Sequence, residues 1–588
     1  MNEQSLFDRY DVSPLLKKIV DGIAMSGAAN APFQVHLQNL NGSSPVFVLQ
    51  HIFTHPQTAT YNHVIVLNDA EEAAYFYNSI ESITGAMDLF YFPSSFKTSQ
   101  NFNLLNPSHV MLRTEALTKL SMGGNKKIIV TYPEAFFEKV IMPKTLQENI
   151  IQIKTNDTLG LNDLMERLVQ YGFERTDFVY EPGQFALRGG IFDIYSFGNE
   201  KPYRVELFGE EVDSIRLFDP ETQLSERKLL QVNIIPNVTT QFEDTIKIPF
   251  MEFVPEHTVV WLKDWTLIQQ RGNDQMEALE AFLLHAPILK ITDDADTHKK
   301  NTDKDDFVAV EKVIEQVFNK PIIEWGFQAN LTKQKLAFST QVQPSFNRQF
   351  QYLIANLQEY EKKGYDLFLF AEQAKQLERL HAIFTDLKTE IQFTPIVKNI
   401  HEGFIDHDHK MVCYTDHQIF QRYHKYKVKQ AYSKNKAITL RTLSDLHPGD
   451  YVTHIDHGVG VYSGLQKIEV NGMMQEAVRI IYKDSDILYV NINSLHKISK
   501  YTGKEGTPPK VNKLGSDAWV KLKDKTKAKV KAIAFDLIKL YAQRKAQTGF
   551  AFTPDNYMMH ELEASFIYED TIDQAKAIAD VKKDMEAP

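Results

Sequence analysis

The segment of this sequence best suited to phosphate chemistry is Asn39-Leu-Asn-Gly-Ser-Ser-Pro45. A phosphate-binding loop needs glycines, a lysine and a Ser or Thr between a strand and a helix, because backbone N–H groups and the lysine hold the phosphates. This segment has one glycine and no lysine, and Pro45 lacks the N–H that would help to hold a phosphate. A magnesium-binding carboxylate pair is missing as well, since the strand end near Trp265 offers Asp264 alone. The sequence therefore predicts no nucleotide binding, no cofactor and no ATP hydrolysis here.

Other catalytic and metal-binding patterns are also missing from the sequence. It has no HExxH motif and no convincing nucleophile elbow, and its single cysteine, Cys413, excludes a multi-cysteine zinc site. His454 and His457 lie three residues apart on an extended, glycine-rich segment, where they need not face one site. We interpret both as structural histidines, and we predict no catalytic residue and no metal site.

A charged and aromatic pattern at Tyr203-Arg-Val-Glu-Leu-Phe208 suggests an interface. Successive side chains of a strand point to opposite faces, so Arg204, Glu206 and Phe208 share one face, opposite a natural core face. An exposed arginine and an aromatic ring on a rigid sheet can anchor a protein partner, and Arg188 could join them. The alternative is that Arg204 and Glu206 form weak surface ion pairs while Phe208 tucks under a loop.

Two segments near the C-terminus carry weaker signals. A long helix is predicted over residues 516–547, with a lysine at every second position from Lys521 to Lys531. This spacing spreads the lysines around the helix, which favours a solvated surface over a phosphate-contacting one. Further on, Phe566 and Gln574 lie near a helix start, where a ring and an exposed amide could recognise adenine. Gln574 is equally plausible as a residue of the first turn of that helix.

The elements that would position these residues alternate between strands and helices in the first part of the chain, which indicates a mostly parallel, covered sheet. An α+β insertion with an antiparallel sheet follows, and then the α/β rhythm returns. From residue 443, short strands with tight turns favour a small β-barrel. The predicted strands are Val46–Leu49, Val64–Leu67, Leu89–Phe92, Lys127–Thr131, Phe178–Glu181, Phe185–Arg188, Ile191–Tyr195, Tyr203–Phe208, Val212–Phe218, Thr258–Leu262, Asp366–Phe370, Glu476–Tyr482 and Ile487–Ile492, and the predicted helices are Pro14–Met25, Ala70–Ile80, Pro133–Val140, Leu161–Tyr171, Asn273–Leu284, Phe346–Lys362, Glu372–Thr385 and Asp573–Met585.

Length and composition limit the classes of protein. The chain has 588 residues, roughly four domains at about 150 residues each, with 43% hydrophobic and 24% charged residues. This balance excludes a fibrous or mainly disordered chain, and no apolar run approaches the roughly 18 residues of a membrane span. A net charge of -11 argues against nucleic-acid binding by the whole surface. One cysteine and the lack of a signal-peptide core fit a reducing cytoplasm, and we expect no membrane partner.

Several segments of the sequence resemble known protein families. Glu181-Pro-Gly-Gln-Phe-Ala-Leu-Arg-Gly-Gly-Ile-Phe-Asp-Ile-Tyr195, with residues 203–223, resembles the UvrA-binding module shared by UvrB and Mfd. His457-Gly-Val-Gly-Val-Tyr-Ser-Gly464 and Leu488-Tyr-Val490 resemble the RNA-polymerase-interacting domain of Mfd, which is related to CarD.

The C-terminal runs complete the resemblance. Gly515-Ser-Asp-Ala-Trp519 and residues 541–552 resemble the relay helix of Mfd and its exit, and residues 566–574 resemble the Q motif of its translocase. In the order of its modules, the chain is similar to the N-terminal half of the Mfd family of transcription-repair coupling factors. Because the chain stops one helix into a new pattern, we expect it to be part of a longer protein.

The resemblance implies a multi-domain α/β fold. It consists of a degenerate helicase-like parallel α/β domain, an inserted α+β UvrA-binding module, a small α/β domain, a small Tudor/CarD-like β-barrel and a long connecting helix. The implied boundaries are 1–144 and 236–345 for the helicase-like domain, 145–235 for the module, 346–437 for the small α/β domain, 443–505 for the barrel, 514–548 for the relay helix and 549–588 for the start of the motor.

The resemblance also implies roles for individual residues. The positions that would contact UvrA are Arg188, Arg204, Glu206 and Phe208. The positions that would contact the RNA polymerase β subunit, by edge-strand pairing and an apolar anchor at Val478, are Glu476, Val478 and Arg479. In the motor, Phe566 and Gln574 would recognise adenine.

The implied function is an adaptor in transcription-coupled DNA repair. It would join stalled RNA polymerase to nucleotide excision repair by recruiting UvrA, as a monomer. The full-length family protein is an ATP- and magnesium-dependent translocase on double-stranded DNA, but we expect no such activity from these residues.

The module that masks the UvrA-binding face in this family is missing, so we expect the face at Phe208 to be open. The alternatives are a UvrB-like damage-processing ATPase or helicase, which would need a nucleotide-binding lysine, and a CarD-like regulator, which explains only the barrel.

Overall fold

The computed structural model describes all residues except 1–3, 27–31, 86–87, 99, 125, 177, 200, 221, 238–245, 286–300, 328–330, 347–348, 423, 425, 427–446, 471–472, 492–497, 502–508, 548, 565, 567–569 and 588. The chain forms two units, which are described separately. The first comprises Met1–Ile151, Ile235–Ala431 and Pro554–Ile578, and the second comprises Gln152–Ile234, Tyr432–Thr553 and Ala579–Pro588.

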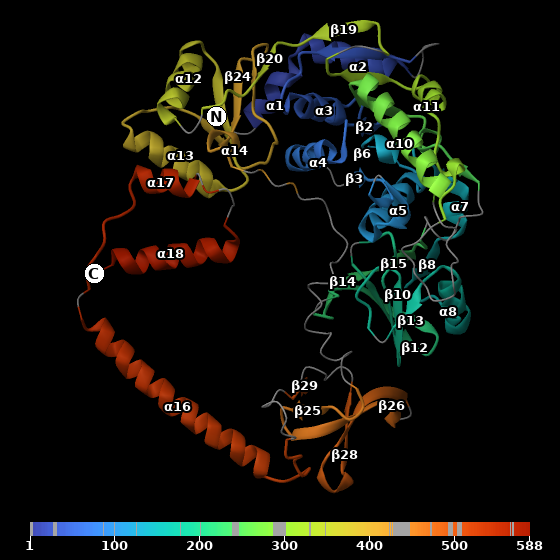
Figure 1. Ribbon diagram of the computed structural model, residues 1–588, viewed down its shortest axis with the longest axis vertical. Helices are drawn as coiled ribbons and strands as arrows, with labels where there is room; N and C mark the ends of the chain where they lie inside the picture. Colours follow the sequence, from blue (N-terminus) through green and yellow to red (C-terminus); the bar gives the residue numbers. More distant parts are fainter. Residues whose placement is uncertain are drawn as a thin grey trace. The chain divides into compact units, whose positions relative to one another are not determined.

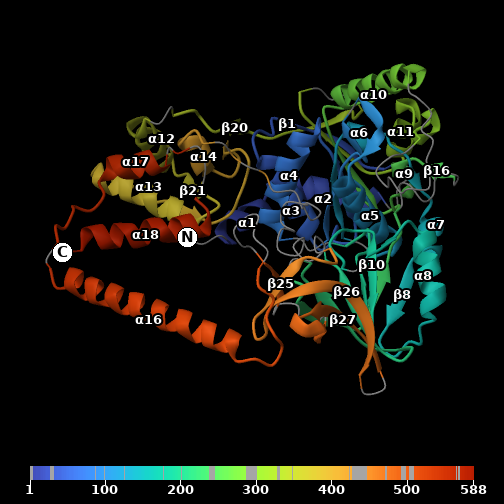
Figure 2. The same ribbon diagram turned by 60° about the horizontal axis from the view of Figure 1, so that its bottom comes forward.

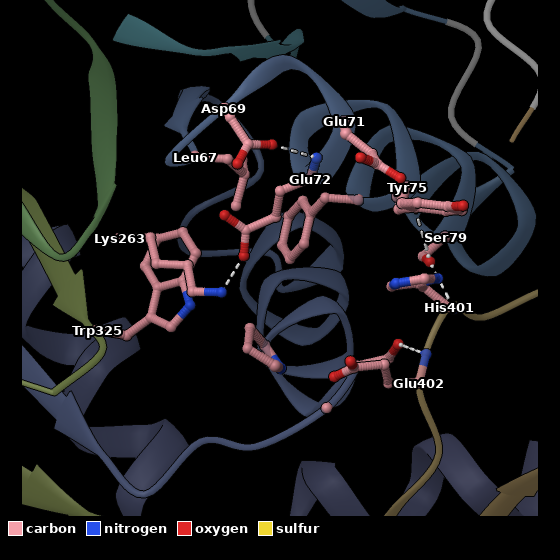
Figure 3. A pocket seen from close by; sticks show the side chains of 14 residues that line it. Leu67, Asp69, Glu71, Glu72, Tyr75, Ser79, Lys263, Trp325, His401 and Glu402 are labelled. Atoms are coloured by element: carbon pink, nitrogen blue, oxygen red, sulfur yellow. Dashed lines mark hydrogen bonds and ion pairs between the residues drawn. The ribbon is translucent and has the colours of Figure 1, made fainter. Parts of the chain in front are cut away.

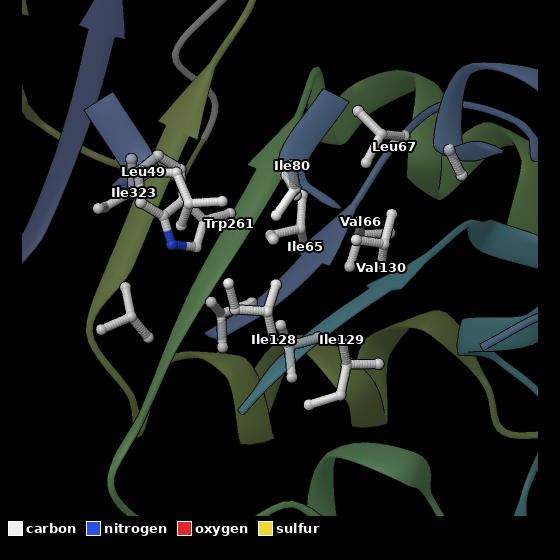
Figure 4. Close-up of a cluster of buried hydrophobic side chains, with 14 of the residues drawn as sticks. Leu49, Ile65, Val66, Leu67, Ile80, Ile128, Ile129, Val130, Trp261 and Ile323 are labelled. Atoms are coloured by element: carbon white, nitrogen blue, oxygen red, sulfur yellow. The ribbon is translucent and has the colours of Figure 1, made fainter. Parts of the chain in front are cut away.

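The first unit is built on a seven-stranded parallel sheet, in the order β19-β1-β18-β17-β2-β6-β3. Its central strands are continuously apolar because helices cover both faces of a parallel sheet. Figure 4 shows Ile65, Val66, Val130 and Trp261 packed in this core. The strands are β1 (Gln34–Gln38), β2 (Asn62–Val66), β3 (Leu89–Phe92), β6 (Ile128–Thr131), β17 (Thr258–Lys263), β18 (Ile322–Trp325) and β19 (Gln334–Ala337).

Helices and short strand pairs complete this domain (Figure 1). The helices are α1 (Gln4–Asp11), α2 (Pro14–Ser26), α3 (Ser44–Thr54), α4 (Ala70–Thr84), α5 (Pro107–Ser121), α6 (Pro133–Phe136), α7 (Pro143–Glu148), α9 (Phe250–Phe253), α10 (Trp265–His285), the short η1 (Lys304–Asp306) and α11 (Val310–Val317). The short pairs are β4 (Phe96–Thr98) with β5 (Asn101–Leu105), and β7 (Val140–Ile141) with β16 (Lys247–Ile248).

The predicted α/β architecture is confirmed, but three element assignments were wrong. Residues 46–49 belong to helix α3 and not to a strand. This helix is buried on nearly all sides, so its sequence has no polar face to reveal the helical period. The predicted helix over residues 133–140 divides into α6 and β7, and residues 178–181 form no strand.

A smaller α/β domain lies in the same unit, with a mixed sheet in the order β20-β23-β24-β21-β22. Figures 1 and 2 both show α17 beside α13, which belongs to this domain. Arg379 of α13 forms an ion pair of 2.8 Å with Glu563 of α17. The elements are β20 (Thr340–Val342), α12 (Phe350–Lys362), β21 (Asp366–Phe370), α13 (Ala374–Asp386), β22 (Thr394–Ile396), β23 (Phe404–Asp406), β24 (Met411–Thr415), α14 (Asp416–Ile419) and α17 (Tyr557–Ala564).

The second unit contains a six-stranded sheet in the order β14-β13-β12-β11-β10-β9. Neighbouring strands are antiparallel except β9 and β10, and this confirms the predicted α+β insertion. Its elements are β8 (Ile151–Lys154), α8 (Leu161–Gln170), β9 (Glu174–Arg175), β10 (Gln184–Arg188), β11 (Ile191–Ile194), β12 (Tyr203–Phe208), β13 (Glu211–Phe218), β14 (Ser225–Leu229) and β15 (Gln231–Ile234), which pairs with β8.

The same unit holds a five-stranded antiparallel sheet in the order β28-β27-β26-β25-β29. Its strands are β25 (Tyr451–His454), β26 (Gly458–Val470), β27 (Met473–Ile481), β28 (Ile487–Asn491) and β29 (Ile498–Lys500), with η3 (Lys483–Ser485) before β28. The long helix α16 (Ala518–Lys545) confirms the predicted one, and α18 (Ile572–Glu586) is the last helix. None of the described helices has the length and apolarity needed to cross a membrane.

Candidate protein-interaction faces and the phosphate-loop position

One face of the six-stranded sheet is organised around a buried carboxylate, Asp193. Arg204 lies directly opposite Asp193 on the neighbouring strand and donates hydrogen bonds of 2.8 and 2.9 Å to its two oxygens. Arg188 donates to the same carboxylate from β10. Two guanidinium groups therefore share one carboxylate that has no contact with solvent. Charge-assisted pairs of this kind hold three strands in a fixed register.

Aromatic rings cover the two arginines. The guanidinium carbons of Arg188 and Arg204 each lie 4.4 Å from a ring centre, over Phe178 and Phe218 respectively. Arg204 also donates a hydrogen bond of 2.9 Å to the carbonyl oxygen of Gln223. Burial lowers the pKa of Arg188, and the Asp193 carboxylate opposes that shift.

The expectation of an outward, solvent-exposed Arg204 is therefore wrong. Only 13% of its side chain is exposed, and only 9% of that of Arg188. The alternation along β12 put Arg204 on the correct face, but the segment that contains Gln223 returns over that face and encloses it.

Phe208 lies at the end of β12 and is 80% exposed, so the interpretation that it tucks under a loop is wrong. Glu206, on the same face, accepts hydrogen bonds from the Ser214 hydroxyl at 2.5 Å and from Arg216 at 3.1 Å. Glu206 thus pairs with Arg216 and not with Arg204. The accessible part of this face consists of Phe208, Glu206 and Arg216, and we name it the Phe208 face.

The five-stranded sheet places its predicted contact residues differently from expectation. Val478 is 2% exposed and packs in the core of the sheet with Ile480 and Tyr482. It pairs with Leu465 on one side and with Val490 on the other, so it lies on neither a free edge nor an exposed surface. The expected edge pairing and apolar anchor at Val478 are therefore wrong.

The neighbours of Val478 are more accessible. Arg479 points to the other face of β27, half-buried and opposite Tyr489, which is 40% exposed. The backbone of Glu476 pairs with β26, and its side chain lies outside the described residues.

The segment 39–43 occupies the position of a phosphate loop, between strand β1 and helix α3. Two of its backbone N–H groups have partners within the protein. The N–H of Ser43 donates to the carbonyl oxygen of Glu402 at 3.1 Å, and the N–H of Asn41 donates to the Thr340 hydroxyl at 2.9 Å. These donors are therefore not free to hold phosphate oxygens.

A cavity of about 320 Å³ lies beside this segment. Figure 3 shows four carboxylates around it, Asp69, Glu71, Glu72 and Glu402, with Lys263 paired to Glu72. Since like charges repel, this lining disfavours a triphosphate.

Gln574 has a local role at the start of α18. Its side-chain oxygen accepts from the N–H of Thr571 at 2.9 Å, and its own N–H donates to the Thr571 hydroxyl at 3.3 Å. This reciprocal pair is a capping box, which supports the first-turn interpretation. Phe566 is 64% exposed.

Histidine side chains lie at two further places in the structure. His454 is buried, and its Nδ1 accepts from the N–H of Asp456 at 3.1 Å, which fits a structural role. A second group, made by His401, His417 and His424, was missed because its members come from three separate segments with no regular spacing.

Comparisons with known proteins agree with this architecture. Residues 151–239 match the UvrB interaction domain family, and residues 446–502 match the CarD-like/TRCF RID domain family. The transcription-repair-coupling factor of Bacillus subtilis is 27% identical, over 96% of this chain and 52% of its own length. The proteins of the same name from Staphylococcus aureus and Staphylococcus haemolyticus are 25% and 26% identical, over 89% of this chain and 50% of theirs. The chain is thus similar to transcription-repair-coupling factors and spans about half the length of these curated relatives.

Proposed function

We propose that this chain is an adaptor in transcription-coupled DNA repair, which recruits UvrA and binds the β subunit of RNA polymerase. The observation that supports this most is the presence in one chain of a UvrB interaction domain and a CarD-like RNA-polymerase-interacting domain. Its similarity to proteins named transcription-repair-coupling factors supports the same function.

UvrA would bind at the Phe208 face. Phe208 is a large, exposed aromatic side chain on a sheet whose register is fixed by the Arg188–Asp193–Arg204 cluster. Aromatic residues on rigid supports dominate protein interfaces because they bury much area at a small cost in side-chain entropy. Arg188 and Arg204 would act by holding the face in shape.

RNA polymerase would bind the five-stranded sheet at β27. β27 pairs with β26 on one side and with β28 on the other, and Arg479 of β27 lies opposite Tyr489 of β28. Arg479 and the partly exposed Tyr489 opposite it would form the contact surface.

We propose that ATP and Mg²⁺ serve a DNA-translocating motor that acts together with this adaptor and displaces the stalled polymerase. The segment 39–43 would have no part in this hydrolysis, because it lacks a lysine and the N–H groups of Asn41 and Ser43 are engaged within the protein. A UvrB-like ATPase is the alternative. A purified chain that releases phosphate from ATP faster than the same chain with Gly42→Asp would favour that alternative.

Binding measurements with separate partners test the adaptor function. Isothermal titration of the chain with UvrA should give binding that Phe208→Ala weakens by about 2 kcal/mol or more, roughly 30-fold. Phe327→Ala is the matched control, because Phe327 is 99% exposed and lies in the other unit. Arg479→Glu should weaken binding to the polymerase β subunit and leave UvrA binding intact. Equal UvrA affinity of wild type and Phe208→Ala would reject the proposed face.

A further inference from the structure

Three imidazole rings meet beside the carboxyl end of the smaller α/β sheet. His401 follows strand β22, His417 belongs to helix α14, and His424 follows that helix. One ring nitrogen from each lies within 4.8 Å of the others. The closest pair is Nδ1 of His401 and Nδ1 of His424, which are 3.1 Å apart.

The hydrogen bonds on the far side of two rings set their tautomers. Nε2 of His424 is 2.6 Å from the side-chain oxygen of Asn399, and Nε2 of His417 is 2.7 Å from the carbonyl oxygen of His401. A carbonyl oxygen can only accept, so both Nε2 atoms carry the proton. The Nδ1 atom of His424 is left with a lone pair that faces Nδ1 of His401. Nδ1 of His417 also keeps its lone pair and lies 3.8 Å from the carboxylate of Asp416. Histidines that bind metals are commonly oriented by such oxygen acceptors.

The three rings are neutral at neutral pH, which is the form that binds metal ions. Burial lowers the pKa of His401 and of His424 to about 4, and it also lowers the pKa of His417. Two cations lie nearby, Lys263 and Arg422, and each is paired with a carboxylate, Glu72 and Asp416 respectively.

We propose that His401, His417 and His424 form a binding site for a divalent transition metal such as Zn²⁺, with a water molecule as fourth ligand. Imidazole nitrogens suit Zn²⁺, Ni²⁺ and Co²⁺. Zn–N bonds of 2.0–2.1 Å in tetrahedral geometry separate two ligand nitrogens by about 3.3 Å, close to the 3.1 Å between His401 and His424.

Binding requires two local changes. The metal takes the place of the proton between Nδ1 of His401 and Nδ1 of His424. His401 takes up a proton at Nε2 as the one at Nδ1 leaves, so its ring stays neutral. The His417 ring now stacks on that of His424, with centres 4.2 Å apart and planes 8° apart. Because lone pairs lie in the ring plane, two parallel rings cannot point at one ion, so the His417 ring turns when the metal binds.

The site would join two domains of the first unit. The segment of His401 lies against helix α4, where Tyr75 stacks on the His401 ring at 3.7 Å (Figure 3). The N–H groups of His401 and Asn399 donate to the hydroxyls of Ser79 and Ser82, at 3.1 and 2.7 Å. A bound metal would therefore stabilise the contact between the seven-stranded domain and the smaller α/β domain. This role is independent of the adaptor function.

Titration of the full, EDTA-treated and desalted chain with ZnCl₂ at pH 7.5 tests the site. We expect one Zn²⁺ per chain and a higher unfolding temperature with Zn²⁺ than with chelator. We expect His401→Gln and His424→Gln to lower the affinity at least about 10-fold, and Asn399→Ala, which keeps all three rings, to lower it about 10–100-fold. His381→Gln, at an exposed histidine of α13, should bind like wild type.

The unfolding temperature of each variant, measured in chelator, shows whether the variant folds without metal. Co²⁺ bound to wild type should show the intense visible absorption of a tetrahedral site, and His424→Gln should lose it. The proposal is overturned if Zn²⁺ leaves the unfolding temperature of wild type unchanged, or if folded His401→Gln and His424→Gln bind Zn²⁺ as tightly as wild type.

Discussion

Asp193 and Arg204 are cross-strand partners on β11 and β12, joined by two hydrogen bonds of 2.8 and 2.9 Å. The carboxylate has no solvent exposure, and it also holds Arg188. An arginine in this position stabilises the sheet and offers little of its side chain to a partner protein. Loss of partner binding in an Arg204 variant would therefore not by itself identify a contact, whereas Phe208 is accessible and can be removed without disturbing this cluster.

The first prediction concerns Asp193→Ala. Removing this carboxylate leaves two largely buried guanidinium groups without their counter-charge, which costs about 3–5 kcal/mol in the free energy of unfolding. Urea unfolding monitored by circular dichroism measures the loss. Glu226→Ala is the control, since the pair of Glu226 with Lys201 is about 40% exposed and exposed pairs contribute about 0–1 kcal/mol. Similar stability losses in the two variants would contradict the structural role of the cluster.

The second prediction separates Val478 from its neighbour Arg479. Val478→Arg places a charge in the core of the five-stranded sheet, where burial of an unpaired charge costs several kcal/mol, so we expect this sheet to unfold. Arg479→Ala should change the free energy of unfolding by no more than about 0.5 kcal/mol. Limited proteolysis followed by mass spectrometry shows whether residues 450–500 become cleavable. Protection of this region in Val478→Arg would contradict the buried position.

The sequence predicted features that repeat along one element, and it failed where distant segments meet. Period-two alternation placed Arg204 and Phe208 on one face of β12, but it could not show that the segment of Gln223 covers Arg204. Helix α3 was mistaken for a strand because burial on nearly all sides removes the polar face that reveals a helix. The cluster of His401, His417 and His424 depends on the packing of a loop against α14, which no local pattern encodes.

The third prediction concerns Gly458, where the start of helix α16 meets the five-stranded sheet. Gly458 has a φ of +78°, and a Cβ there would lie 2.7 Å from the side chain of Asn512 and 2.9 Å from Trp519. Trp519 donates from its ring N–H to the carbonyl oxygen of Ile455 at 3.0 Å. Gly458→Ala therefore combines backbone strain of about 1–3 kcal/mol with a clash that pushes Trp519 away.

Fluorescence quenching measures this effect, since Trp519 is the accessible member of the four tryptophans and the other three are at most 3% exposed. Iodide should quench Gly458→Ala more strongly than wild type. Gly464→Ala is a matched control, because Gly464 has a φ of +97° and open space around it. Gly464→Ala should lower the free energy of unfolding through backbone strain but should leave iodide quenching as in wild type. Equal quenching in Gly458→Ala and Gly464→Ala would contradict the contact between Gly458 and Trp519.

The last prediction is a pH dependence that originates at His63 in strand β2. Its side chain is fully buried, and its Nδ1 accepts a hydrogen bond of 3.0 Å from the ring N–H of Trp261. Burial lowers the pKa of His63 from 6.5 to about 3. Between these two values the unfolded chain binds a proton that the folded chain excludes. The stability from neutral His63 is thus complete above pH 6.5 and falls by about 1.4 kcal/mol per pH unit as the pH drops toward 3.

Urea unfolding at pH 7.5, 6.0 and 5.0, in the presence of chelator, measures this slope. His63→Gln can still accept from Trp261 but cannot bind a proton, so its stability should fall less steeply than that of wild type below pH 6.5. His381→Gln should keep the wild-type slope, because His381 is exposed. The difference in slope between His63→Gln and wild type should approach about 1.4 kcal/mol per pH unit. Parallel stability curves for wild type and His63→Gln would contradict the prediction, because they would mean that His63 takes up a proton as readily in the folded chain as in the unfolded chain.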